Sequence, residues 1–143
     1  MLIRNRARSK CESRRRGAVI VEFALVAPVF LILITGIIEL GRAIVVQQLL
    51  TNASREGARI AGYDSTTSTS TVTTAVDSYL ANVGVSGATT TVSPNPPSLA
   101  SDGQSVTVTV SIPFTTVSYL PTPFYLGGKS LQATTVMCRE PAP

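Results

Sequence analysis

One apolar run constrains this chain more than any other feature. From Ala18 to Ile38 there are 21 consecutive residues with a single charged side chain, Glu22. A helix of that length spans about 30 Å at about 1.5 Å per residue, which matches the hydrocarbon core of a bilayer. The sequence therefore predicts a transmembrane helix that carries one carboxylate near its start.

Charge is distributed unevenly around this run. Residues 1–17 hold seven basic residues against one acidic residue, a net charge of +6, whereas residues 18–143 carry −2. A basic leader before an apolar span stays in the cytoplasm, so the remainder is exported. We expect the leader, residues 1–17, to be disordered or removed, and to contact anionic lipid. A nucleic-acid arm is disfavoured, because nothing beyond the span offers a basic or aromatic surface.

The span is expected to continue as a projecting helix over residues 18–62. No proline follows Pro28 in this stretch, and Gly62 is a suitable stop. Glu39 and Arg42 form an i, i+3 pair that marks the exit from the membrane. Small and apolar residues at alternating spacings of three and four form a seam along this helix, and they are Ala43, Val46, Leu50, Ala53, Gly57 and Ile60. The seam is expected to pack either against neighbouring subunits or under this chain's own C-terminal domain.

The rest of the chain predicts a small exported domain. Residues 63–71 form a Ser/Thr linker that is too poor in apolar side chains to pack, and the domain covers residues 72–143. The fold class is α+β, a long N-terminal transmembrane helix followed by one short helix on a three- to four-stranded antiparallel sheet. The helix is expected at 72–83 and the strands at 88–92, 105–112 and 131–138, with a fourth candidate at 115–120.

Catalytic chemistry is not indicated. The chain has no histidine, and its acids beyond the helix are scattered singly. Its two cysteines, Cys11 and Cys138, fall on opposite sides of the proposed membrane and offer no metal-site spacing. We expect no enzyme activity, no cofactor, no metal and no small-molecule substrate.

Glu22 requires an explanation, because a carboxylate within a span costs about 2.5–3.5 kcal/mol on the insertion scale. It either reaches the cytoplasmic edge or meets a positive partner in the membrane. A cut after Gly17 would create a free amine on Ala18, at a depth suited to neutralise Glu22 of an adjacent subunit. A buried pair of this kind enforces register more than it adds stability.

These residues resemble a known family. Basic residues before Gly17, followed after a gap by Glu22-Phe23, resemble the processing site of type IV prepilins and pseudopilins. Further blocks resemble the TadE-like pseudopilins of tight-adherence (Flp) pilus systems, at residues 21–28, 36–42 and 50–59.

The resemblance implies a minor pilin-like structural subunit that a prepilin peptidase cuts after Gly17. Ala18 would become the mature N-terminus, and Glu22 with Phe23 would act in subunit assembly. It also implies a single-pass protein of the bacterial inner membrane whose partners are membrane lipid, the peptidase, other pilin-like subunits and the pilus assembly machinery.

Two alternatives remain open at this point. The chain could be an uncleaved, signal-anchored surface protein whose small β domain binds a ligand or partner. The second alternative concerns polar residues of the long helix, which either contact other helices or form a solvated face. These residues are Glu39, Arg42, Asn52, Arg55, Glu56 and Arg59.

Overall fold

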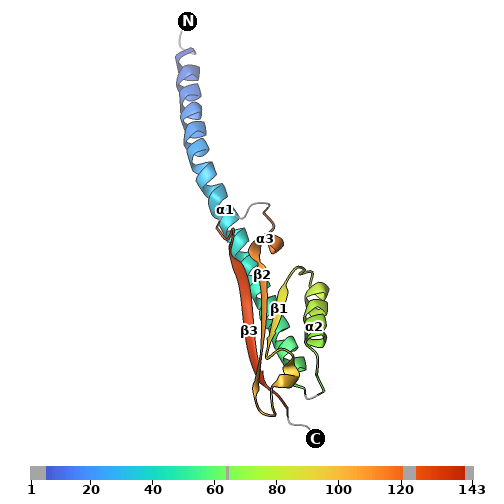
Figure 1. Ribbon diagram of the computed structural model, residues 1–143. Coiled ribbons are helices and arrows are strands. Elements are labelled where there is room, and N and C mark those ends of the chain that lie inside the picture. Colours follow the sequence, from blue (N-terminus) through green and yellow to red (C-terminus); the bar gives the residue numbers. More distant parts are fainter. Residues whose placement is uncertain (1–5, 64, 121–124, 141–143) are drawn as a thin grey trace. The chain divides into compact units, whose positions relative to one another are not determined.

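A computed structural model describes residues 6–63, 65–120 and 125–140, with side chains from residue 17 onward. The chain divides into two compact units, Met1–Ile38 and Glu39–Pro143. The elements, labelled in Figure 1, are α1 (Arg6–Gly62), α2 (Thr69–Asn82), β1 (Thr89–Ser93), a short 3-10 turn (Pro97–Leu99), β2 (Ser105–Pro113), α3 (Phe114–Val117) and β3 (Ser130–Cys138). The predicted α+β class is confirmed.

The first unit is the N-terminal part of α1, which begins at Arg6 and not at Ala18. The expectation of disorder is therefore wrong for residues 6–17, while residues 1–5 lie outside the described part of the chain. Arg, Lys, Glu and Ala are good helix formers, and extending an existing helix is much easier than nucleating one. No proline occurs in the helix before Pro28.

The second unit contains an antiparallel sheet in the order β1-β2-β3. Val108 at the centre of β2 pairs with Val92 of β1 and with Thr135 of β3. Alternate residues of β2 point into the core, and the buried ones are Val106, Val108, Val110 and Ile112. The hydroxyl-bearing residues between them face the other side of the sheet.

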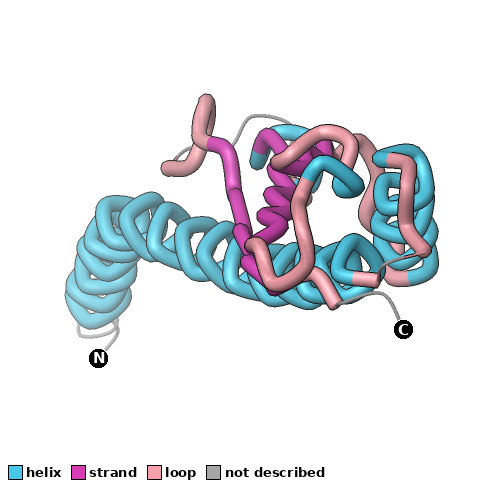
Figure 2. Tube along the Cα trace, turned by 60° about the horizontal axis from the view of Figure 1, so that its bottom comes forward, coloured by secondary structure: helices cyan, strands magenta, loops and turns pink. Residues whose placement is uncertain are grey.

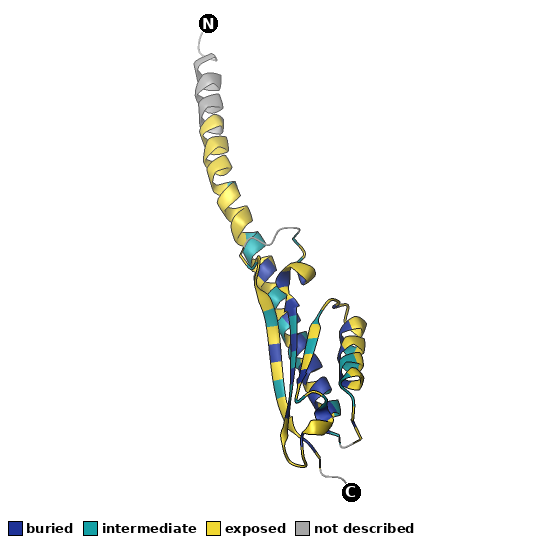
Figure 3. Ribbon diagram, in the orientation of Figure 1, coloured by how far each residue is buried: buried dark blue, intermediate teal, exposed yellow. Residues whose placement is uncertain are grey.

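The later part of α1 packs within this unit, where the strands lie over it (Figure 1 and Figure 2). Val46, Leu50 and Ala53 are fully buried. In Figure 3 this later part of the helix carries dark blue and teal patches, whereas the earlier part is mostly yellow. At Gly57 an added Cβ would meet Val76 of α2 and Val108 of β2. The seam therefore packs under the chain's own domain, the second of the two options that the sequence left open.

The stretch at residues 115–120 is not a strand. Pro113 ends β2, and the next four residues form the single helical turn α3 with Phe114 and Val117 buried. Apolar residues three apart suit one side of a helical turn, whereas in a strand they would point to opposite faces. The sheet therefore has three strands in the described chain.

The Ser/Thr stretch is more ordered than expected. Thr66 is buried and its hydroxyl donates to the Ile60 carbonyl at 2.7 Å. The next helix begins at Thr69, with Ser68 as an N-cap that accepts from the Ser70 N–H. Thr66 therefore packs, contrary to the expectation for this stretch, because its hydroxyl binds a backbone group that an apolar side chain could not satisfy. Ser65, Thr67, Ser70 and Thr71 are exposed, as expected for a linker. Asp64 lies outside the described residues.

Candidate functional site

The residues expected to act in processing and assembly lie on the exposed N-terminal part of α1. Gly17, Ala18, Glu22 and Phe23 are all exposed, and an added Cβ at Gly17 would meet no atom within 4 Å. The apolar side chains from residue 19 to residue 33 are exposed in the same way, apart from the half-buried Ala27. An apolar surface of this extent requires lipid or protein around it.

Within the described residues, one helix is long and apolar enough to cross a membrane, and its most apolar stretch is not buried by any other part of the chain. The second unit begins at Glu39, directly after the apolar run. The N-terminal part of α1 is therefore an exposed apolar helix, whereas the part from Glu39 onward belongs to the C-terminal unit.

Glu39 and Arg42 contact residues at the end of α3 and beyond it. The Glu39 side chain, only 2% exposed, accepts a hydrogen bond from the Tyr125 N–H at 2.9 Å. Arg42 donates from Nε to the Val117 carbonyl at 2.9 Å, and its guanidinium lies 4.6 Å from the centre of the Tyr119 ring. The sequence predicted that Glu39 and Arg42 pair with each other. It contained no signal for the contacts to Tyr119 and Tyr125, which are far away along the chain.

The block from Asn52 to Arg59 has two sides. Its buried residues are all small, and they are Ala53, Ser54, Gly57 and Ala58. At Gly57 the side chains of Val76 on α2 and Val108 on β2 approach closely. Asn52, Arg55 and Arg59 are exposed, and Glu56 is partly exposed. Part of this block is thus explained by packing within the chain, and its polar side faces outward.

Ser54 is the polar residue on the buried side of this block. It donates to the Thr51 carbonyl at 2.9 Å, and its oxygen lies 2.8 Å from the hydroxyl oxygen of Thr135 on β3. Because a serine hydroxyl has one hydrogen, Thr135 donates to Ser54 when Ser54 donates to Thr51. This bond ties β3 to α1 and was not foreseen from the sequence.

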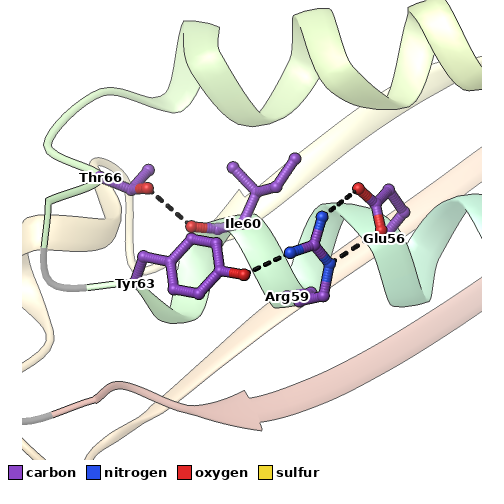
Figure 4. Close-up of polar contacts among 5 residues, drawn as sticks. All are labelled: Glu56, Arg59, Ile60, Tyr63 and Thr66. Atoms are coloured by element: carbon purple, nitrogen blue, oxygen red, sulfur yellow. Dashed lines mark hydrogen bonds and ion pairs between the residues drawn. The ribbon is translucent and has the colours of Figure 1, made fainter.

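Glu56, Arg59 and Tyr63 form a polar cluster near the end of α1 (Figure 4). Arg59 binds the Glu56 carboxylate through Nε at 3.0 Å and through a terminal nitrogen at 2.5 Å, and it also donates to the Tyr63 hydroxyl. The hydrogen bond from Arg59 lowers the pKa of Glu56, and the same bond raises the pKa of Arg59. A cation in the last turn also interacts favourably with the helix dipole.

Comparison with known families matches part of the chain. A family model described as TadE-like protein matches residues 17–59. The matched segment starts at Gly17 and covers the apolar run, the Glu39 and Arg42 region and the Asn52-to-Arg59 block. This confirms the TadE-like resemblance of that segment, which is less than half of the chain. Comparisons with curated proteins and with solved structures gave no match.

Proposed function

We propose that this chain, TadE-like over residues 17–59, is a minor pilin-like subunit of the bacterial inner membrane. A prepilin peptidase cuts it after Gly17, and it acts in assembly of an adhesive tight-adherence pilus or a related envelope complex. The observation that carries the proposal is the family match, which begins at the glycine of the proposed cut and includes an apolar helix with Glu22.

The division of α1 supports a structural subunit. From residue 43 onward one side of the helix is occupied by the chain's own sheet and α2, so that side is closed to partners. Residues 18–38 present apolar side chains without a covering layer from this chain. Subunit contacts within the membrane therefore involve the N-terminal part of the helix.

Glu22 fixes the register in which neighbouring subunits pack against each other in the membrane. Its side chain is exposed on the helix in the isolated chain. After cleavage, the amine of Ala18 on a neighbouring subunit neutralises this carboxylate in the membrane, where an unpaired charge is costly. Phe23, exposed beside it, adds apolar contact area.

The test is N-terminal sequencing of the protein extracted from membranes of its native host. We expect the mature chain to start at Ala18. An intact Met1 would instead support the uncleaved, signal-anchored surface protein, and a start beyond Ile38 would exclude both functions. Gly17→Leu should leave the precursor uncut while membrane insertion is unchanged. Arg14→Lys, which keeps the charge of the leader, is the matched control and should be cut normally.

A further inference from the structure

The exposed surface of α1 changes character shortly after the proposed span. At residues 40–45 the exposed side chains are apolar, with Leu40 57% and Ile44 54% exposed. From Gln48 onward the fully exposed residues of the helix are polar or charged, and they are Gln48, Asn52, Arg55 and Arg59. The apolar surface of the helix thus ends between Val45 and Gln48, and not at Ile38.

Two tyrosines lie beside this part of the helix. Tyr119 is 71% exposed and lies against the Arg42 guanidinium, and Tyr125 is 50% exposed and donates its N–H to Glu39. Glu39 is buried, so its carboxylate does not contribute to the exposed surface of this part of the helix. Together these residues form a collar around α1, comprising Leu40, Arg42, Ile44, Val45, Tyr119 and Tyr125.

The dimensions of the collar match those of a lipid headgroup layer. From Leu40 to Val45 the helix rises about 7.5 Å, at about 1.5 Å per residue. The polar layer on each side of a bilayer is about 5–8 Å thick, by the difference between total and hydrocarbon thickness. Tyrosine is enriched at this boundary, where its ring meets acyl chains and its hydroxyl meets water.

We propose that the collar lies in the headgroup layer of the exported face of the membrane and seats the C-terminal domain on the lipid surface. This rests on the proposed function, which places residues 18–38 in the bilayer. Lipid is favoured over a second copy of the chain because the collar mixes apolar side chains with tyrosine hydroxyls and a guanidinium. That mixture suits a layer that is apolar on one side and wet on the other. Arg42 adds a cation beside the lipid phosphates.

The absence of tryptophan from the sequence allows a direct test. Three single-tryptophan variants of the full chain are reconstituted in phosphatidylcholine–phosphatidylglycerol vesicles, with or without bromine on the lipid chains. Tyr119→Trp reports on the collar and keeps an aromatic ring against Arg42. Asn52→Trp is the control on the exposed polar side of the same helix, and Leu31→Trp is the control within the span.

With bromine near the headgroups we expect the emission of Tyr119→Trp to be quenched, because its side chain lies in the interfacial layer beside the bromine. Asn52→Trp should be unaffected, and Leu31→Trp should be quenched by lipids brominated deep in the chains. If Leu31→Trp is quenched while Tyr119→Trp is not, the collar proposal is overturned and the membrane span stands. If Leu31→Trp is also unquenched, the proposed membrane function fails together with the collar.

If a second copy of the chain covers the collar, the fluorescence of Tyr119→Trp responds differently. The emission of Tyr119→Trp would then shift to shorter wavelength as the protein-to-lipid ratio rises, with no bromine quenching at any ratio. That result would overturn the lipid seat in favour of a protein contact.

Discussion

Gly57 of α1 and Val76 of α2 lie so close together that a Cβ added to Gly57 would stand 2.7 Å from Cγ2 of Val76. The same Cβ would be 3.1 Å from Cγ1 of Val108 on β2. At this point α1, α2 and the sheet meet in one place. The missing side chain of Gly57 therefore sets how closely the three elements approach.

Gly57→Ala should destabilise the domain despite the better helix propensity of alanine. The propensity gain is about 1 kcal/mol, whereas overpacking costs about 1–3 kcal/mol. Valine is stiff at χ1, so Val76 and Val108 cannot easily move aside. Thermal unfolding of the full chain in detergent, followed by circular dichroism, should show a lower midpoint. Gly41→Ala, on the same helix with no atom within 4 Å of the added Cβ, is the control and should not lower it.

The bond between Ser54 and Thr135 should contribute measurably to stability. Ser54→Ala removes the acceptor of the Thr135 hydroxyl, and we expect a loss of about 1 kcal/mol for this partly buried bond. Thr135→Val removes the other partner at similar volume. Because the two hydroxyls bind each other, the double variant should be less destabilised than the sum of the two single variants, by about 0.5–1 kcal/mol. Additive single effects would show that the two hydroxyls do not interact.

Glu39→Ala should loosen the segment around Tyr125. The substitution removes the acceptor of the Tyr125 N–H, and a typical hydrogen bond of this kind contributes about 0.5–1.5 kcal/mol. Hydrogen exchange of the Tyr125 amide should become faster, while the amides of β2 stay protected. Glu39→Gln keeps an acceptor oxygen at the same length and should restore much of the protection. Equal exchange in all three proteins would be inconsistent with this contact.

Acid should weaken the end of α1 through Glu56. Arg59 lowers the pKa of this carboxyl in the folded chain, so its contribution to stability is present above the ordinary pKa of about 4.3. The contribution is lost as the pH falls through the lowered value. The effect is small because the pair is exposed. Glu56→Gln should therefore reduce the difference between the unfolding midpoints at neutral pH and in acid, with Asp77→Asn on the exposed side of α2 as the control.

Glu22→Ala should separate insertion from assembly. Removing a carboxylate from the span should leave membrane insertion unchanged or improve it. If Glu22 pairs with the Ala18 amine of a neighbour, crosslinking to partner subunits in the native host should fall while cleavage after Gly17 continues. Unaltered association would favour a carboxylate that simply reaches the cytoplasmic edge.

Local patterns in the sequence were sufficient for much of the fold. The alternation in β2 matches its buried residues, and the apolar spacing at residues 72–83 matches the burial of Val72, Val76 and Leu80, since each pattern repeats with the period of its own element. Val83 has the same spacing but is exposed, because α2 ends before it. Residues 115–120 misled because their short apolar-polar pattern fits a strand or a helical turn. The position of Pro113 and the burial of Phe114 decided for the turn.

The apolar run, the asymmetric charge and the Gly17-to-Phe23 pattern were determined by the sequence alone, because each depends only on neighbouring residues. The sequence left open what the seam of α1 packs against. It predicted that Glu39 and Arg42 pair with each other, and it did not indicate their contacts with Tyr125 and Val117 or the contact of Ser54 with Thr135. Those contacts join residues such as Glu39 and Tyr125, which are 86 positions apart. Only the packing of the sheet and α3 against α1 brings them within hydrogen-bond distance. A local sequence pattern cannot predict such a contact, because it depends on residues that are far apart along the chain.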